Sequence, residues 1–189
     1  MRVISGEFKG KKILEPKDKI TRPLRDLVKE SIFNIIKHSG KFSINLNDSN
    51  VLDLFSGVGS FGIEALSRGS KFVTFVENYP IVLEILRKNL QNLNLNDKCE
   101  IVEKNILNNF DFNKFNKKFE IIFLDPPFNE KKISKIIYEI YNAKILEKKG
   151  ILIIHRKSNT NDELIPEYNV IEEKKYGISK IIFGNYLKV

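Results

Sequence analysis

The chain has 189 residues, of which 32 are Lys or Arg and 24 are Asp or Glu, giving a net charge of +8 and a pI near 9.4. This length suits one domain with a sizeable hydrophobic core, and the positive charge suggests a polyanionic partner. Its one cysteine, Cys99, excludes an intrachain disulfide, and the lack of a long apolar run or signal-like start predicts a cytoplasmic protein without a membrane partner.

The first forty residues form a basic segment that differs from the rest. Two short strands are predicted at 2–6 and 11–14, and apolar residues at helical spacing predict a helix over 23–37. Through Lys29, nine Lys and Arg oppose four Asp and Glu, so +5 of the net charge lies here. Concentrated basic charge with an interleaved Phe8 is typical of nucleic-acid contact. A hairpin-and-helix cap that only aids solubility is the alternative.

From residue 43 onward, predicted strands alternate with predicted helices. Strands are expected at 50–55, 71–77, 100–103, 120–124 and 150–155, with helices at 60–68, 80–93 and 133–141. This alternation predicts a parallel sheet with helices on both faces. Strands at 169–176 and 180–188, joined through Gly177, predict a closing antiparallel hairpin. We therefore expect a basic extension at 1–40 and an α/β domain at 41–189.

A glycine-rich loop follows the first strand of the alternating region. Residues 53–62 contain G-x-G-x-x-G, and Glu77 lies twenty residues after Gly57, where a ribose ligand is expected. Asp53 lies at the carboxyl end of that strand, where its charge would repel a pyrophosphate but attract the ammonium and sulfonium of S-adenosylmethionine. The glycines then allow close backbone approach to the ligand, and Glu77 can accept from both ribose hydroxyls.

A second motif, Asp125-Pro126-Pro127-Phe128, ends the apolar run 121–124. Proline lacks the N–H that a sheet requires, so the pair stops the strand in a stiff turn. The Asp125 carboxylate and the Pro126 carbonyl only accept hydrogen bonds, which suits the NH₂ group of a flat heterocycle. Phe128 can stack on the same ring. A strand-end turn without function is the alternative, and the glycine-rich loop makes it less favoured.

Together the two motifs resemble the class I S-adenosylmethionine-dependent methyltransferases that modify exocyclic amino groups. Further segments resemble, more narrowly, the bacterial small-subunit (16S) ribosomal RNA guanine-N2 methyltransferases. These segments are Arg2-Val3-Ile4-Ser5-Gly6, Lys9-Gly10, Arg22-Pro23, 26–34, Glu64-Ala65-Leu66-Ser67-Arg68-Gly69 and Tyr176-Gly177. The chain departs from that family at Leu24, where threonine is usual, and at Leu27, where a basic residue is common. Asn105 stands at an adenine-contacting position that is often aspartate, and an amide oxygen there can accept from the adenine amino group.

The resemblance implies a Rossmann-like fold, with a mostly parallel seven-stranded sheet, a C-terminal antiparallel hairpin and an N-terminal hairpin and helix. It implies methyl transfer from S-adenosylmethionine to guanine N2 in small-subunit ribosomal RNA, free or in the assembling subunit, by a monomer without a metal. The expected catalytic residues are Asp125, Pro126, Pro127 and Phe128. The expected cofactor-binding residues are Asp53, Phe55, Ser56, Gly57, Gly59, Glu77, Asn78, Asn105 and Ile106. The expected RNA-binding residues are Lys9, Lys11, Lys12, Arg22, Arg25 and Lys29.

Other functions explain less of the sequence. A nicotinamide dehydrogenase leaves the Asp-Pro-Pro-Phe motif unused, and a noncatalytic RNA-binding module leaves both motifs unused. A cytosine-C5 methyltransferase needs a cysteine nucleophile, whereas Cys99 begins a predicted strand and suits a structural role. The nearest alternative methylates adenine N6, in DNA or RNA, or a protein amide, through the same motif. His38 and His155 lack metal-ligand spacing, and both are expected to be structural.

Overall fold

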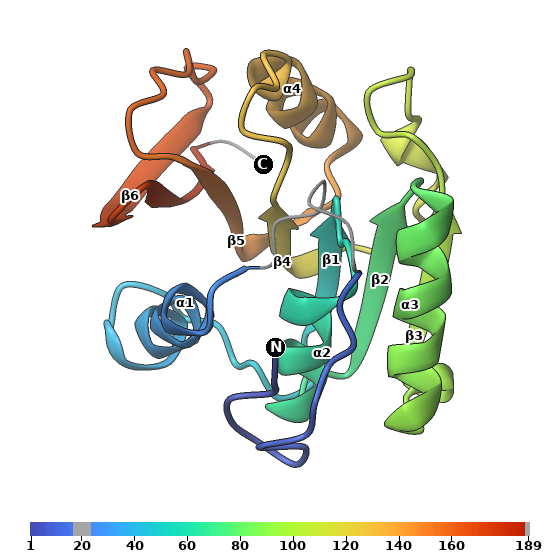
Figure 1. The fold of residues 1–189 in the computed structure, drawn as a ribbon. Coiled ribbons are helices and arrows are strands. Elements are labelled where there is room, and N and C mark those ends of the chain that lie inside the picture. The colour runs from blue at the N-terminus through green and yellow to red at the C-terminus, as the bar shows by residue number, and fades with distance from the viewer. Residues whose placement is uncertain (17–23, 188–189) are drawn as a thin grey trace.

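The apolar runs of the sequence form one mixed sheet, described over residues 1–16 and 24–187 of a computed structural model (Figure 1). Within these residues seven strands lie in the order β3-β2-β1-β4-β5-β7-β6. They are β1 (Asn50–Leu54), β2 (Phe72–Glu77), β3 (Cys99–Glu103), β4 (Phe119–Leu124), β5 (Leu146–Lys157), β6 (Tyr168–Tyr176) and β7 (Ser179–Tyr186). Strands β1 to β5 are parallel, and β7 pairs antiparallel with both β5 and β6. The predicted parallel sheet with a closing hairpin is confirmed.

Helices cover both faces of the sheet because successive side chains of a strand point to opposite sides. The helices are α1 (Asp26–His38), α2 (Ser60–Ser67), α3 (Pro80–Asn92) and α4 (Ile133–Ala143), with short 3₁₀ turns at η1 (Asn96–Lys98) and η2 (Phe112–Lys114). On β1, Val51 packs with α1, α2 and α3, whereas its neighbour Leu52 packs with α4. Among the described helices, none is long and apolar enough to cross a membrane.

Some boundaries differ from those predicted. Strand β5 begins at Leu146 rather than near residue 150, because Leu146 pairs with Phe119 across a register shift. Helix α1 begins at Asp26, and Pro23, where the helix was predicted to begin, lies outside the described residues. Lys188, the predicted end of the last strand, also lies outside them.

The N-terminal segment packs along α2, as the dark blue chain in Figure 1 shows. Within residues 1–16 the two predicted strands meet at one isolated antiparallel bridge, between Arg2 and Lys12, so the prediction of two regular strands is wrong. The backbone turns instead to α2, where the buried Glu64 carboxylate accepts from the N–H groups of Ile4 at 2.7 Å and Ser5 at 3.0 Å. Hydrogen-bond donors taken by α2 cannot extend a strand ladder.

Close approach to α2 also explains a glycine in this segment. Gly6 has φ of +84°, and a Cβ there would lie 1.8 Å from the Ser67 carbonyl oxygen. The apolar residues Val3 and Ile13 belong to the same core cluster as α1, α2 and α3. The basic segment therefore shares one hydrophobic core with the α/β region.

A buried charge network holds this contact together. The fully buried Lys29 and Glu64 place Nζ 3.7 Å from Oε2, and Arg68 donates from Nε to Glu64 at 2.7 Å. Burial lowers the pKa of Lys29, although the charges of Glu64 and Asp26 oppose the shift. Removing one member of such a network leaves a buried charge without compensation.

We expect Glu64→Ala to destabilise the protein by about 3–5 kcal/mol, because it removes the fully buried partner of Lys29 and leaves that ammonium only the partly exposed Asp26, at 3.9 Å. Denaturant unfolding measures the change. Glu139→Ala is the matched control, since Glu139 pairs with Lys135 at 3.6 Å on the surface of α4, and loss of such a pair costs about 0–1 kcal/mol. Equal losses in the two variants would contradict a structural role for the buried network.

Candidate active site

The two sequence motifs meet where the order of strands changes direction. Strands β1 and β4 lie side by side and parallel, with Leu54 opposite Leu124. The Asp125 N–H donates to the Leu54 carbonyl at 3.2 Å, which joins the Asp-Pro-Pro-Phe turn to the start of the glycine-rich loop. Ligands of parallel α/β sheets bind in the crevice at such a switch point. The sheet therefore brings both motifs to one crevice.

The loop between β1 and α2 is tightly folded against β2. Phe55, Gly57 and Gly59 all have left-handed backbone angles, with φ of 59°, 56° and 85°. A left-handed phenylalanine is uncommon, and such conformations concentrate at ligand sites. The Ser56 N–H donates to the Val76 carbonyl of β2 at 3.1 Å. The Gly59 N–H donates to the Ser56 carbonyl at 2.9 Å, so the loop is ordered by its own backbone and by β2.

The third glycine of the fingerprint serves packing. Gly62 lies in α2, and a Cβ there would lie 2.3 Å from the Phe75 ring of β2. The absence of a Cβ at Gly62 lets α2 approach β2 closely.

Glu77, at the end of β2, holds the glycine-rich loop. One oxygen, Oε2, accepts from the Gly57 N–H at 2.9 Å. The other, Oε1, accepts from the N–H groups of Asn78 at 2.7 Å and Tyr79 at 2.9 Å. Two carboxylate oxygens offer about four acceptor sites, and these three bonds leave one of them for a ribose hydroxyl.

Asp53 is almost fully buried, with an exposed fraction of 1%. Its Oδ2 accepts from the Gly62 N–H at 3.0 Å. Burial raises the pKa of Asp53 well above its usual value of 3.8, the charges of Asp125 and Glu77 raise it further, and the Gly62 bond opposes the shift. Three mutually repelling carboxylates favour a cation between them. The residues therefore fit the ammonium and sulfonium of S-adenosylmethionine and disfavour the pyrophosphate of a nicotinamide dinucleotide.

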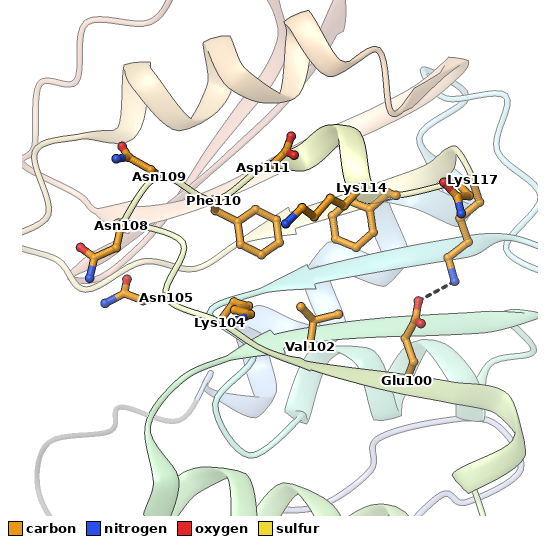
Figure 2. Close-up of a pocket in the computed structure, with 12 residues that line it drawn as sticks. Glu100, Val102, Lys104, Asn105, Asn108, Asn109, Phe110, Asp111, Lys114 and Lys117 are labelled. Carbon is orange, nitrogen blue, oxygen red and sulfur yellow. Dashed lines mark hydrogen bonds and ion pairs between the residues drawn. The ribbon is translucent and has the colours of Figure 1, made fainter.

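A groove beside the edge strand β3 lies next to the predicted adenine position (Figure 2). It encloses about 790 Å³ and is lined by Glu100, Val102, Lys104, Asn105, Asn108, Asn109, Phe110, Asp111, Lys114, Phe115, Asn116 and Lys117. The Asn105 Oδ1 accepts from the Leu107 N–H at 2.8 Å, so the oxygen expected to meet adenine orders its own turn. Its NH₂ group is the donor that remains, which suits a ring nitrogen of adenine. Ile106 is buried beneath this turn.

The Asp-Pro-Pro-Phe turn is held from the neighbouring strand β5. Asp125 Oδ1 lies 2.7 Å from His155 Nδ1, and the His155 ring stands edge-to-face with Phe128 at a centroid distance of 5.4 Å. Pro126 is buried and Pro127 is exposed. His155 was predicted to be only structural, and its contact with Asp125 was missed. The contact between Asp125 and His155 depends on the register that places Leu124 opposite Ile154, which no short motif in the sequence predicts.

Arg156, the next residue of β5, also donates hydrogen bonds to the Asp-Pro-Pro-Phe turn. The guanidinium is 2% exposed and donates to the carbonyls of Pro127 at 3.2 Å and Glu130 at 2.8 Å. Asp162 accepts from Nε and Nη2, both at 2.8 Å, which fixes the guanidinium plane. Bidentate pairing of this kind is geometrically demanding. No motif in the sequence marks Arg156, because the turn it supports lies 26–29 residues earlier in the chain and is contacted through backbone carbonyls.

The predicted RNA-binding residues separate into two groups. Lys9, Lys11, Lys12 and Arg25 are exposed. Lys29 is fully buried and donates from Nζ to the Arg2 carbonyl at 2.8 Å. The prediction that Lys29 contacts RNA is wrong, because a side chain enclosed by protein cannot reach a phosphate.

Arg22, the remaining predicted RNA contact, lies outside the described residues. Leu24, which replaces the usual threonine, is a core residue, whereas Leu27, which replaces a basic residue, is 69% exposed. The first departure serves packing, and the second removes a charge from the surface of α1.

The sequence is similar to a known protein family and to named methyltransferases. The model of the family described as "Conserved hypothetical protein 95" matches residues 1–185. The chain is 31% identical over 180 residues to "Ribosomal RNA small subunit methyltransferase D" of Haemophilus influenzae, covering 94% of this chain and 90% of that protein.

Solved structures show the same architecture. The Escherichia coli protein yhhF, provisionally named a methyltransferase, matches 98% of this chain and 97% of its own with a TM-score of 0.81 and 25% identity. An RNA methyltransferase from Salinibacter ruber, solved with S-adenosyl-L-homocysteine, matches 89% of this chain and 96% of its own with a TM-score of 0.65 at 13% identity, which bears on the fold alone. The predicted class I methyltransferase fold is confirmed.

We expect Asp53→Asn to stabilise the protein increasingly as the pH rises, because it removes a buried ionisable group while keeping an acceptor for Gly62. Because the pKa of Asp53 is raised in the folded state, ionising Asp53 destabilises the fold. This penalty is absent below the unfolded-state pKa near 3.8, grows as the pH rises, and is complete above the folded-state pKa. The gap in melting temperature between the variant and the wild type should therefore shrink from pH 8 to pH 5. Asp97→Asn, at an exposed aspartate, is the control. A gap independent of pH would contradict the assignment.

Proposed function

The chain belongs to the conserved hypothetical protein 95 family, and from this membership and the crevice geometry we propose that it transfers a methyl group to guanine N2 in small-subunit ribosomal RNA. The single observation that carries the proposal is the adjacency of the carboxylate-lined glycine loop and the Asp125 turn on β1 and β4. One binds the methyl donor and the other binds the amino group that receives the methyl. RNA as the substrate follows from the name of the Haemophilus relative and from the basic segment.

S-adenosylmethionine is the methyl donor of this methyltransferase. When bound, it supplies an electrophilic methyl group on a positively charged sulfur. Asp53 and Glu77 would hold its cationic and hydroxyl groups, and the left-handed backbone at Gly57 and Gly59 would allow the loop to approach it closely. The Asn105 NH₂ group would donate to its adenine ring.

The Asp125 turn orients the target nitrogen. The lone pair of an exocyclic amine is delocalised into the ring, so hydrogen bonds from its two N–H groups to Asp125 and the Pro126 carbonyl would localise the pair and aim it at the methyl group. His155 already engages Oδ1, which leaves Oδ2 for the substrate. Alignment of this kind can supply roughly 7–11 kcal/mol of the barrier reduction. Asp125 then accepts the proton that the nitrogen releases, or passes it to water.

The target base has to be unpaired or flipped to reach this turn. Phe128 offers the stacking platform, and the edge-to-face contact with His155 fixes its ring plane. The exposed Lys9, Lys11 and Lys12 contact the phosphates of the surrounding RNA. Their segment is tied to α2, the helix that follows the glycine loop, so we propose that residues 1–40 bind RNA and residues 41–189 bind the cofactor and base.

We expect Asp125→Ala to transfer methyl groups about a hundredfold more slowly or worse, because the target nitrogen loses its orienting acceptor. Its affinity for S-adenosylhomocysteine, measured by calorimetry, should stay within a few-fold of the wild type. The assay supplies labelled cofactor with undermethylated small ribosomal subunits or with naked RNA, followed by nucleoside analysis. N2-methylguanine is the expected product. N6-methyladenine as the sole product would leave an amino-methyltransferase with a different base, and a C5-methylated pyrimidine would refute the mechanism.

The charge-reversed variant Lys9→Glu, Lys11→Glu, Lys12→Glu should bind RNA weakly while it binds cofactor normally. If three phosphate contacts are lost, the slope of log affinity against log salt should fall by about two to three. The control reverses three exposed lysines of the α4–β5 region, Lys144, Lys148 and Lys149, which changes the net charge equally. RNA affinities measured by filter binding that fall equally in both variants would show a general effect of net charge.

A further inference from the structure

His155 is a buried imidazole with one engaged nitrogen. It lies near the carboxyl end of β5 with an exposed fraction of 7%. Its Nδ1 contacts Asp125 Oδ1 at 2.7 Å, and its ring contacts Phe128 edge-to-face at an interplanar angle of 81°. Among the described residues its Nε2 is buried and has no hydrogen-bond partner. One side chain thus contacts both the acceptor and the stacking platform of the proposed base site.

In the hydrogen bond between His155 and Asp125, the imidazole is the donor. An ionised carboxylate only accepts hydrogen bonds, so the Asp125–His155 bond requires a proton on Nδ1. A proton on Nε2 as well would bury a second N–H donor without an acceptor. The geometry therefore favours a neutral ring in the Nδ1–H tautomer.

We propose that His155 is a positioning residue for methyl transfer, which rests on the function proposed above. Its Nδ1–H bond holds the Asp125 carboxylate so that Oδ2 faces the amino group of the base. Its ring holds Phe128 at the angle at which that base stacks. One rigid base must donate to Asp125 and stack on Phe128 at the same time. Because the His155 imidazole contacts both side chains, it fixes their relative orientation.

A neutral donor suits this task better than a lysine or arginine. Positive charge develops on the target nitrogen as the methyl group arrives, and the negative charge of Asp125 stabilises it. A cationic partner would cancel that charge, whereas a neutral imidazole orients the carboxylate and leaves the charge in place. The adjacent Arg156 instead contacts the backbone carbonyls of Pro127 and Glu130 and is paired with Asp162, so its charge is balanced away from Asp125.

Nuclear magnetic resonance tests the pair without any substrate. The chain has two histidines, so a sample labelled with ¹⁵N-histidine gives two sets of ring signals, and His38→Asn assigns them. We expect His155 to show the Nδ1–H tautomer, and the Nδ1 proton signal to shift or vanish in Asp125→Ala. A ring in the Nε2–H tautomer, or one unaffected by Asp125→Ala, would overturn the proposal.

Two substitutions separate positioning from packing. His155→Phe keeps a ring against Phe128 but removes the donor, and His155→Asn removes the ring but keeps an N–H donor near the position of Nδ1. We expect His155→Phe to lower kcat by about tenfold to a hundredfold, with the KM for cofactor and the affinity for S-adenosylhomocysteine nearly unchanged. His155→Asn should recover part of kcat, because it restores the donor to Asp125 but not the ring that contacts Phe128. His38→Asn, on an exposed histidine at the end of α1, should match the wild type.

The outcomes distinguish this proposal from the one on which it rests. Full activity in His155→Phe, or no recovery in His155→Asn despite normal folding, would overturn the positioning role while wild-type methylation keeps the function. A parallel loss of cofactor affinity and melting temperature in both variants would show a structural role only. If the wild type methylates no RNA, the proposed function fails, and the proposed role for His155 fails with it even where the magnetic resonance spectra show the pair.

Discussion

The parallel pairing of β1 with β4 is the constraint on which the crevice depends. Its register places Asp53 opposite Phe123 and Leu54 opposite Leu124, so the glycine-rich loop and the Asp125 turn leave the sheet at the same edge. The connections that follow these two strands lead to helices on opposite faces, which opens a crevice above them. This pairing positions the glycine-rich loop against the Asp125 turn, while the pairings of β2 with β1 and of β3 with β2 bring Glu77 and the turn of Asn105 to the same edge.

Like charges held inside that crevice determine what it can bind. Asp53, Glu77 and Asp125 repel one another, and burial adds to the cost of ionising Asp53. Backbone N–H groups of Gly57 and Gly62 compensate part of that cost. The ammonium and sulfonium groups of S-adenosylmethionine would compensate part of the remainder, which is the electrostatic basis of the proposed cofactor site.

A second buried carboxylate connects the basic segment to the crevice. Glu64 accepts from the backbone of Ile4 and Ser5, while Lys29 and Arg68 balance its charge. Because α2 begins at the glycine-rich loop, the segment that carries the exposed lysines is packed on the helix that orders the cofactor loop. The contacts proposed with RNA and with the methyl donor would therefore be made by two ends of one packed unit.

Local pattern in the sequence was sufficient for the element order, the parallel sheet with its closing hairpin, and the two crevice motifs, because side-chain periodicity and proline and glycine chemistry act over a few residues. Tertiary structure alone decided three other points. Lys29 is an internal counter-ion rather than an RNA contact, the Asn105 oxygen orders its own turn, and His155 and Arg156 support the Asp125 turn. Each depends on burial or register between distant segments, which spacing along the chain does not encode.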